Sequence, residues 1–225
     1  MSTFTVLTHY SPSYDPVAAI TLPGREAYCH RHGYRHVIQR GPYHDAGLYY
    51  AIDRLYLLLD DMRADSALSD THQTECENHF YWVVNIPTII TNHTIKLESF
   101  VDDTHDFFIH RDVNALNAGS FIVRNSEWGR RWVQFIIDDT KTHRHEWFEN
   151  FSILRHAETD AWKDKVKVVP HPGFNSYEYQ RGYSMSPDTP GQWKPGHFVL
   201  ALPGMDIDKR LGFLRSDWLQ SSIIT

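Results

Sequence analysis

The segment FYWVVNIPTIITN, residues 80–92, joins an apolar run to a polar turn. The run FYWVV is typical of a buried strand, and Asn85-Ile86-Pro87 follows it directly. A pair of carboxylates at such a strand end could hold a divalent cation, because Mg²⁺ and Mn²⁺ prefer oxygen ligands. Asn85 offers only a neutral amide, and the side chain of Pro87 has no ligating atom. The residue types therefore predict that Asn85-Ile86-Pro87 binds no metal.

Length, composition and net charge limit the classes of protein that this sequence can belong to. A chain of 225 residues with 41% hydrophobic residues suits one α/β domain, which we predict to span residues 1–225. A formal net charge of -6 argues against general affinity for nucleic acid or anionic membranes. Cys29 and Cys76 form neither a disulfide framework nor a metal-ligand pattern. Without an apolar signal core or a membrane-length apolar run, the protein is expected in the cytoplasm.

Strand and helix patterns alternate along the chain. Strands are expected at residues 4–8, 34–40, 80–84, 106–112, 117–125 and 165–170. Helices are expected at residues 25–33, 46–64, 126–143 and 145–159, with Gly33 ending the first and Ser126 capping the third. Residues 170–204 read as loop-rich.

This alternation predicts an α/β fold with a mostly parallel central sheet and helices on both faces. Sites in such sheets lie beyond the carboxyl ends of the strands. Thr8, Asn85 and Asp112 each fall at such an end, so we expect the three residues to converge.

Several segments together resemble the family-34 glycosyltransferases, which include fungal α-mannosyl- and α-galactosyltransferases and plant xyloglucan xylosyltransferases. The resemblance covers roughly residues 4–215, and its most specific part is DVNALNAGSFIVRNSEW at residues 112–128. The supporting segments, in chain order, are YCHRHGY, FYWVVNIPTIITNHTIKLESFVDD, WFENFSIL and GHFVLALPG.

The resemblance implies a GT-A fold and transfer of a sugar, with retention, from a nucleotide donor such as a UDP- or GDP-sugar. In that family an Asp-x-Asp motif and a C-terminal histidine hold Mn²⁺ or Mg²⁺, which stabilises the leaving diphosphate. The corresponding positions here are Asn85, Pro87 and Ala201. No metal cofactor is therefore expected, although Mn²⁺ or Mg²⁺ bound elsewhere stays possible.

Two interpretations follow from the missing ligands. Protein cations could neutralise the diphosphate, since guanidinium and ammonium groups act as fixed charges. The candidates are Arg54, Arg111, Lys209 and Arg210. Alternatively, the chain could be a non-catalytic protein that keeps the fold and binds nucleotide sugars.

The resemblance also assigns sugar-facing residues. It places Asp112, Asn114 and Asn117 against the donor sugar, with Gly119 allowing close approach of the backbone. Asp112 and Asn114 could equally well only cap turns.

Other residues are assigned to the acceptor and to the nucleotide. Glu149-Asn150 matches an acidic-Gln pair near the acceptor, so Asp112, Glu149 and Asn150 are the catalytic candidates. Thr8 and Tyr14 fall where GT-A enzymes hold the base and ribose, and Tyr14 stacking on the base is the expectation.

The sequence leaves two classes of acceptor possible. Without a membrane anchor, a bacterial or bacteriophage member is expected. Its acceptor would be a glycan precursor or a hydroxymethylated pyrimidine in phage DNA. A DNA acceptor would need a basic strip, which could be built from Arg124, Arg130, Arg131, Lys141, Arg144 and Arg155.

Overall fold

The central element of the fold is a six-stranded sheet with the order β2-β1-β3-β6-β5-β7. The computed structural model describes residues 2–44, 50–67, 78–112, 115–170, 173–177 and 192–225. The strands of this sheet are β1 (Thr3–Tyr10), β2 (Arg35–Arg40), β3 (His79–Val84), β5 (Phe107–Arg111), β6 (Leu116–Arg124) and β7 (Val166–Val169). Every strand that the sequence predicts in this sheet is present, with small shifts at the ends.

The sheet is mostly parallel, as predicted. β1 pairs in parallel with β2 and β3, and β5 pairs in parallel with β7. β6 alone runs antiparallel, between β3 and β5. The chain therefore enters β6 at the edge where the other five strands end, which brings the start of β6 to the predicted site.

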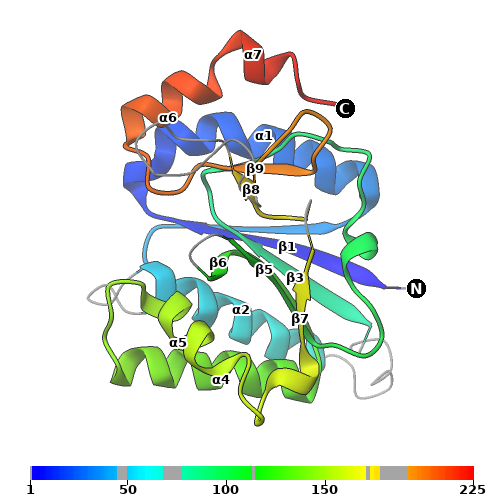
Figure 1. The fold of residues 1–225 in the computed structure, drawn as a ribbon, viewed down its shortest axis with the longest axis vertical. Coiled ribbons are helices and arrows are strands. Elements are labelled where there is room, and N and C mark those ends of the chain that lie inside the picture. The colour runs from blue at the N-terminus through cyan, green and yellow to red at the C-terminus, as the bar shows by residue number, and fades with distance from the viewer. Residues whose placement is uncertain (1, 45–49, 68–77, 113–114, 171–172, 178–191) are drawn as a thin grey trace.

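Helices cover both faces of the sheet (Figure 1). They are α1 (Asp15–His32), α2 (Tyr50–Ala67), α4 (Glu127–Thr142), α5 (Phe148–His156), α6 (Ile207–Leu214) and α7 (Asp217–Gln220). In β3 the side chains alternate: Tyr81 and Val83 join the core under α2 and α4, whereas Phe80, Trp82 and Val84 join the core on the α1 side. Both faces are therefore buried, which explains the unbroken apolar run of this strand.

A second sheet lies on the α1 side and was not predicted from the sequence. It has the order β4-β9-β8 and consists of β4 (Thr88–Ile90), β8 (Ser176–Tyr177) and β9 (Val199–Ala201). With α1, α6 and α7 it encloses a third apolar core, which includes Leu200 and Leu214. Its strands have only two or three residues, too few for a periodic pattern.

Two predicted helices have different bounds in the structure. α1 begins at Asp15, although Pro23 was expected to precede the helix. Buried Val17, Ala18 and Thr21 keep the turn before Pro23 against the core, so packing outweighs the missing N–H donor. α5 has nine residues and begins only after Trp147. The caps at Gly33, in the left-handed region with φ 70°, and at Ser126 are confirmed.

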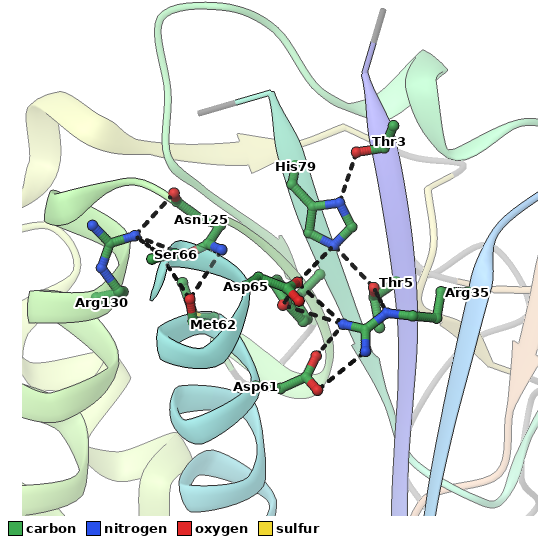
Figure 2. Close-up of polar contacts among 11 residues, drawn as sticks. Thr3, Thr5, Arg35, Asp61, Met62, Asp65, Ser66, His79, Asn125 and Arg130 are labelled. Atoms are coloured by element: carbon green, nitrogen blue, oxygen red, sulfur yellow. Dashed lines mark hydrogen bonds and ion pairs between the residues drawn. The ribbon is translucent and has the colours of Figure 1, made fainter. Parts of the chain in front are cut away.

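A polar network at the amino edge of the sheet fixes one end of α2 (Figure 2). Arg35 of β2 pairs with Asp61 and, at 3.2 Å, with Asp65, both on α2. The ring nitrogens of His79 lie 2.7 Å and 2.9 Å from the hydroxyls of Thr3 and Thr5. The other end of α2 therefore lies at the carboxyl edge, where this helix presents Arg54.

Candidate active site

The carboxyl edge of the sheet contains a cavity of about 790 Å³, here called the central cavity. Asn85, which follows β3, and Asp112, which follows β5, both line it, as do Gly119 of β6 and Glu149 of α5. Asn85 and Asp112 therefore converge as predicted. Thr8 does not line the cavity: it is fully buried, and its hydroxyl accepts a 2.6 Å hydrogen bond from Arg25 Nη1.

The three positions that would hold a metal in the family lie together in the central cavity. Asn85, Pro87 and Ala201 all line it, and the Leu202 N–H donates to the Pro87 carbonyl at 3.2 Å, which fixes β9 beside the turn. The Asn85 Oδ1 accepts a hydrogen bond from Arg54 Nη1. Because a guanidinium only donates, this contact occupies one lone pair of the atom through which Asn85 could ligate a cation and places a positive charge beside it. The amide N–H₂ group is left as the donor.

These residues do not fit a divalent metal ion. A hard cation needs several oxygen ligands, and the two remaining side chains here are a pyrrolidine ring and a methyl group. Among the residues that the structure describes, no three His, Cys, Asp or Glu side chains form a group that could hold a metal.

Arg54 has a protein partner for its charge. It is 5% exposed and donates to Glu149 Oε1, to Asn85 Oδ1 and, at 2.7 Å, to the Ala118 carbonyl. A buried ion pair of this kind is stable only when its hydrogen-bond geometry is good, and removing one partner leaves an uncompensated buried charge. Arg54 therefore orients Glu149 and Asn85, and its charge is already matched before any diphosphate arrives.

Glu149 and Asn150 stand in the first turn of α5 and both line the central cavity. Glu149 is 5% exposed, and its Oε2 has no hydrogen-bond partner within the described chain. Asn150 Oδ1 accepts from the Ala118 N–H at 2.7 Å. The preceding backbone is strained, because Phe148 has φ 46°. This turn therefore places Glu149 in the wall of the cavity, with its Oε2 buried.

Asp112, which follows β5, and Asn117 of β6 are joined by a hydrogen bond. Asp112 Oδ1 accepts from the Ala115 N–H at 3.1 Å, and Oδ2 accepts from Asn117 Nδ2 at 2.6 Å. Asn117 Oδ1 in turn accepts from the Gly119 N–H at 2.8 Å. Asp112 thus caps the turn while it lines the cavity, and its contact with a donor sugar stays a prediction. Asn114 lies outside the described residues.

Gly119 is surrounded by amide side chains. A Cβ at this position would stand 2.9 Å from Asn117 Oδ1, 3.5 Å from Asn85 Nδ2 and 3.9 Å from Asn175 Oδ1. Asn175 was not singled out from the sequence, although it is 2% exposed and lines the cavity. Its Nδ2 has no partner within the described ranges. The cavity floor is therefore a cluster of neutral amides, a surface suited to sugar hydroxyls.

A second cavity of about 410 Å³, here called the side cavity, lies next to the central one. His9 and Tyr14 line it, and the stacking of Tyr14 on a base stays a prediction. Six residues line both cavities: Arg54, Asn85, Pro87, Trp147, Phe148 and Glu149. The Arg54–Glu149 pair therefore stands at the junction of the two cavities.

Lys209 and Arg210 are adjacent in α6 but have different environments. Lys209 is exposed and pairs at 3.4 Å with Asp206, and it lines neither cavity. Arg210 is 3% exposed and donates from Nε and Nη2 to the Leu202 carbonyl at 3.2 Å and 3.0 Å. Its guanidinium lies 5.4 Å from the centre of the Tyr14 ring. Arg111, the other proposed cation, pairs with Glu158 at the surface.

Three residues of the basic strip considered for a DNA acceptor have partners within the protein, and the strip itself stays a prediction. Arg124 is 9% exposed, pairs with Asp106 at 3.2 Å and donates to the Asp102 carbonyl. Arg155 lies 3.6 Å from Asp139, and Lys141 donates to the Tyr56 hydroxyl at 3.0 Å. These partners lie far from Arg124, Arg155 and Lys141 in the sequence, so the sequence does not predict them.

The model of the galactosyl transferase GMA12/MNN10 family matches residues 73–210, which include most of the site described above. This chain belongs to that family. By family and by fold it is a glycosyltransferase. No curated protein matches the sequence.

Solved structures share the GT-A fold of this glycosyltransferase. A glycosyltransferase involved in the glycosylation of the major capsid of PBCV-1 has a TM-score of 0.66 at 11% identity, over 94% of this chain and 98% of its own. The glycosyltransferase GlyE of Streptococcus pneumoniae has a TM-score of 0.51 at 10% identity and covers 100% of this chain, which spans 65% of GlyE. An active-site mutant of LgtC has a TM-score of 0.50 at 10% identity, over 98% of this chain and 96% of its own.

No helix in the described part of this glycosyltransferase has the length and apolar character needed to cross a membrane.

Proposed function

We propose that this glycosyltransferase takes a nucleotide-sugar donor, transfers the sugar with retention to a carbohydrate hydroxyl, and needs no divalent metal. The orientation of Asn85 carries the proposal. The Asn85 oxygen accepts a hydrogen bond from Arg54. The Asn85 amide therefore offers its N–H groups to an anionic ligand at the position where the family has a metal ligand.

The two cavities suit the two halves of a nucleotide sugar. The side cavity, with Tyr14 and His9, is suited to a base and a ribose, since an aromatic ring can stack on any base. The central cavity, with its amide floor, is suited to the sugar. The diphosphate then lies at the junction, beside Asn85 and Pro87.

Glu149 is the residue best placed to act on the reacting carbon. As the bond to the diphosphate breaks, the anomeric carbon gains positive charge, as in other oxocarbenium-like transition states. The negative charge of the Glu149 carboxylate, in the wall of the cavity, can stabilise that charge, while Arg54 holds Oε1 and fixes the direction of the carboxylate. Asp112 supports the floor of the same cavity through Asn117.

A carbohydrate acceptor suits the site better than DNA does. Trp147 lines both cavities and is 50% exposed, an open aromatic face on which a sugar ring can stack. Among the described residues that line the two cavities, Arg54 is the only Lys or Arg, and Glu149 matches its charge. DNA binding needs several phosphate contacts from such residues.

A transfer assay with two classes of acceptor tests this proposal. UDP- and GDP-sugars are each offered with neutral oligosaccharides and with DNA that contains hydroxymethylated pyrimidines. We expect nucleoside diphosphate release and a product of retained anomeric configuration with an oligosaccharide only. Product on DNA would overturn the acceptor class. Donor binding without transfer to any acceptor would favour the non-catalytic alternative.

Replacing Trp147 by Ala should raise the KM for the acceptor about tenfold, and more than the KM for the donor, because loss of one stacked ring is worth about 1–3 kcal/mol. Trp218 is a matched control: it is 48% exposed but lines neither cavity. An unchanged acceptor KM in Trp147→Ala would remove this residue from the acceptor site.

A further inference from the structure

Two buried arginines of this protein have no acidic partner among the described residues. Arg25 of α1 is 1% exposed, and Arg210 of α6 is 3% exposed. Arg25 donates to the Thr8 hydroxyl at 2.6 Å and to the carbonyls of Asn85 and Thr88 at 3.1 Å and 2.7 Å. Arg210 donates only to the Leu202 carbonyl, and its Nη1 has no hydrogen-bond partner in the described chain.

Other buried arginines of the chain are matched by carboxylates. Arg54 pairs with Glu149, and Arg124 pairs with Asp106. An unmatched buried charge is costly, so it calls for a compensating role. Burial lowers the pKa of Arg25 to about 10, which still leaves its guanidinium charged at neutral pH. The protein therefore carries two positive charges that nothing in its described interior neutralises.

Both charges lie behind the same part of the site. The carbonyls that Arg25 and Arg210 hold belong to Asn85, Thr88 and Leu202, and all three residues line the central cavity. These residues coincide with, or adjoin, the three family positions for metal ligands. Each guanidinium is thus hydrogen-bonded to backbone whose residues line the cavity next to these positions.

We propose that Arg25 and Arg210 together supply, through the backbone, the fixed positive charge that holds the donor diphosphate in place of a metal ion. Neither residue needs to touch the ligand. Each orients the turn that does, and its field acts across a region of low dielectric, where screening is weak. This inference rests on the proposed use of a nucleotide-sugar donor.

The arrangement also explains why the exposed or paired cations are poor candidates. Water and Asp206 screen the charge of Lys209, and Glu149 compensates the charge of Arg54. By contrast, neither water nor a carboxylate of the described residues compensates the buried charges of Arg25 and Arg210, so their electrostatic field can act on a bound anion.

Calorimetry with UDP, GDP and the nucleosides uridine and guanosine, in EDTA, tests the proposal. Arg25→Gln and Arg210→Gln keep a hydrogen-bond donor but remove the charge, whereas Arg25→Lys and Arg210→Lys keep the charge. We expect each Gln variant to weaken diphosphate binding about tenfold, the size of one partly screened charge interaction, and to leave nucleoside binding unchanged. The Lys variants should retain most of the diphosphate affinity. Arg31→Gln and Arg215→Gln remove exposed arginines of the same region as matched controls.

Equal loss of nucleoside and diphosphate affinity, or equal behaviour of the Gln and Lys variants, would show a structural role only and overturn the inference. A second measurement needs no variant. In ³¹P spectra of the parent protein with bound UDP or GDP, the pKa of the terminal phosphate should fall below that of the free nucleotide; an unchanged or higher value would also overturn it. A parent protein that binds neither UDP nor GDP would instead overturn the proposed function.

Discussion

Replacing Glu149 by Gln is expected to lower turnover by about 10²–10³-fold while UDP or GDP affinity does not fall. The amide oxygen can still accept from Arg54, so the side chain keeps its place. It loses the negative charge that opposes the positive charge of the reacting carbon. A group that acts mainly in the transition state reduces kcat without a matching change in ground-state binding. Steady-state kinetics with donor calorimetry on the same variant measure both quantities.

Glu158→Gln is the matched control, because Glu158 is an exposed carboxylate paired with a surface arginine. Such a pair contributes little, so its turnover should match that of the parent. Near-normal turnover in Glu149→Gln would remove this carboxylate from the mechanism. Glu149→Ala asks a second question: with Arg54 left unpaired, the free energy of unfolding should fall by about 3–5 kcal/mol.

Replacing Arg124 by Gln should lower the free energy of unfolding by about 1–3 kcal/mol, because buried Asp106 then keeps only its 3.5 Å pair with Lys165. For a chain of this size the melting temperature should fall by about 2–12 °C. Folded Arg124→Gln should keep the turnover of the parent, since Arg124 lies at the amino edge, away from both cavities. Thermal unfolding and kinetics below the transition measure the two effects.

Arg131 supplies the comparison, because it is exposed on the neighbouring helix and belonged to the same proposed strip. Arg131→Gln should change stability by less than about 0.5 kcal/mol. Equal stability of the two variants would contradict the assignment of Arg124 to a buried ion pair. If Arg124→Gln and Arg131→Gln both lost activity on a DNA acceptor, that result would support the predicted basic strip.

The fold followed from the sequence wherever a pattern was long. The apolar run at residues 80–84 and the cap at Ser126 each depend on local rules, and both were found where the sequence places them. The start of α1 was missed because Pro23 signals a break locally, whereas the buried residues that hold the turn before it are tertiary contacts. The second sheet was missed because its strands are too short to carry a period.

The positions of the candidate site were predicted only in part, since Thr8 and Lys209 line neither cavity, and its pairings were not predicted. Asn85, Pro87 and Ala201 could be found by their order in the chain, and the structure brings them together. No sequence rule links Arg54 to Glu149, which lie 95 residues apart. Arg25 was missed for the same reason: in the sequence it reads as one charged residue of a helix, and only the fold buries it behind the turn.

Titration of UDP and GDP into the protein, first in EDTA and then with added Mn²⁺, tests the central claim most directly. Because Asn85, Pro87 and Ala201 supply no cation ligands and Arg25 and Arg210 supply positive charge behind them, the dissociation constant should be the same in both conditions within about twofold. Turnover should be unaffected as well. Binding or turnover that disappears in EDTA and returns with Mn²⁺ would contradict the account, and Asp112 and Asp206 would then be the first residues to test as metal ligands.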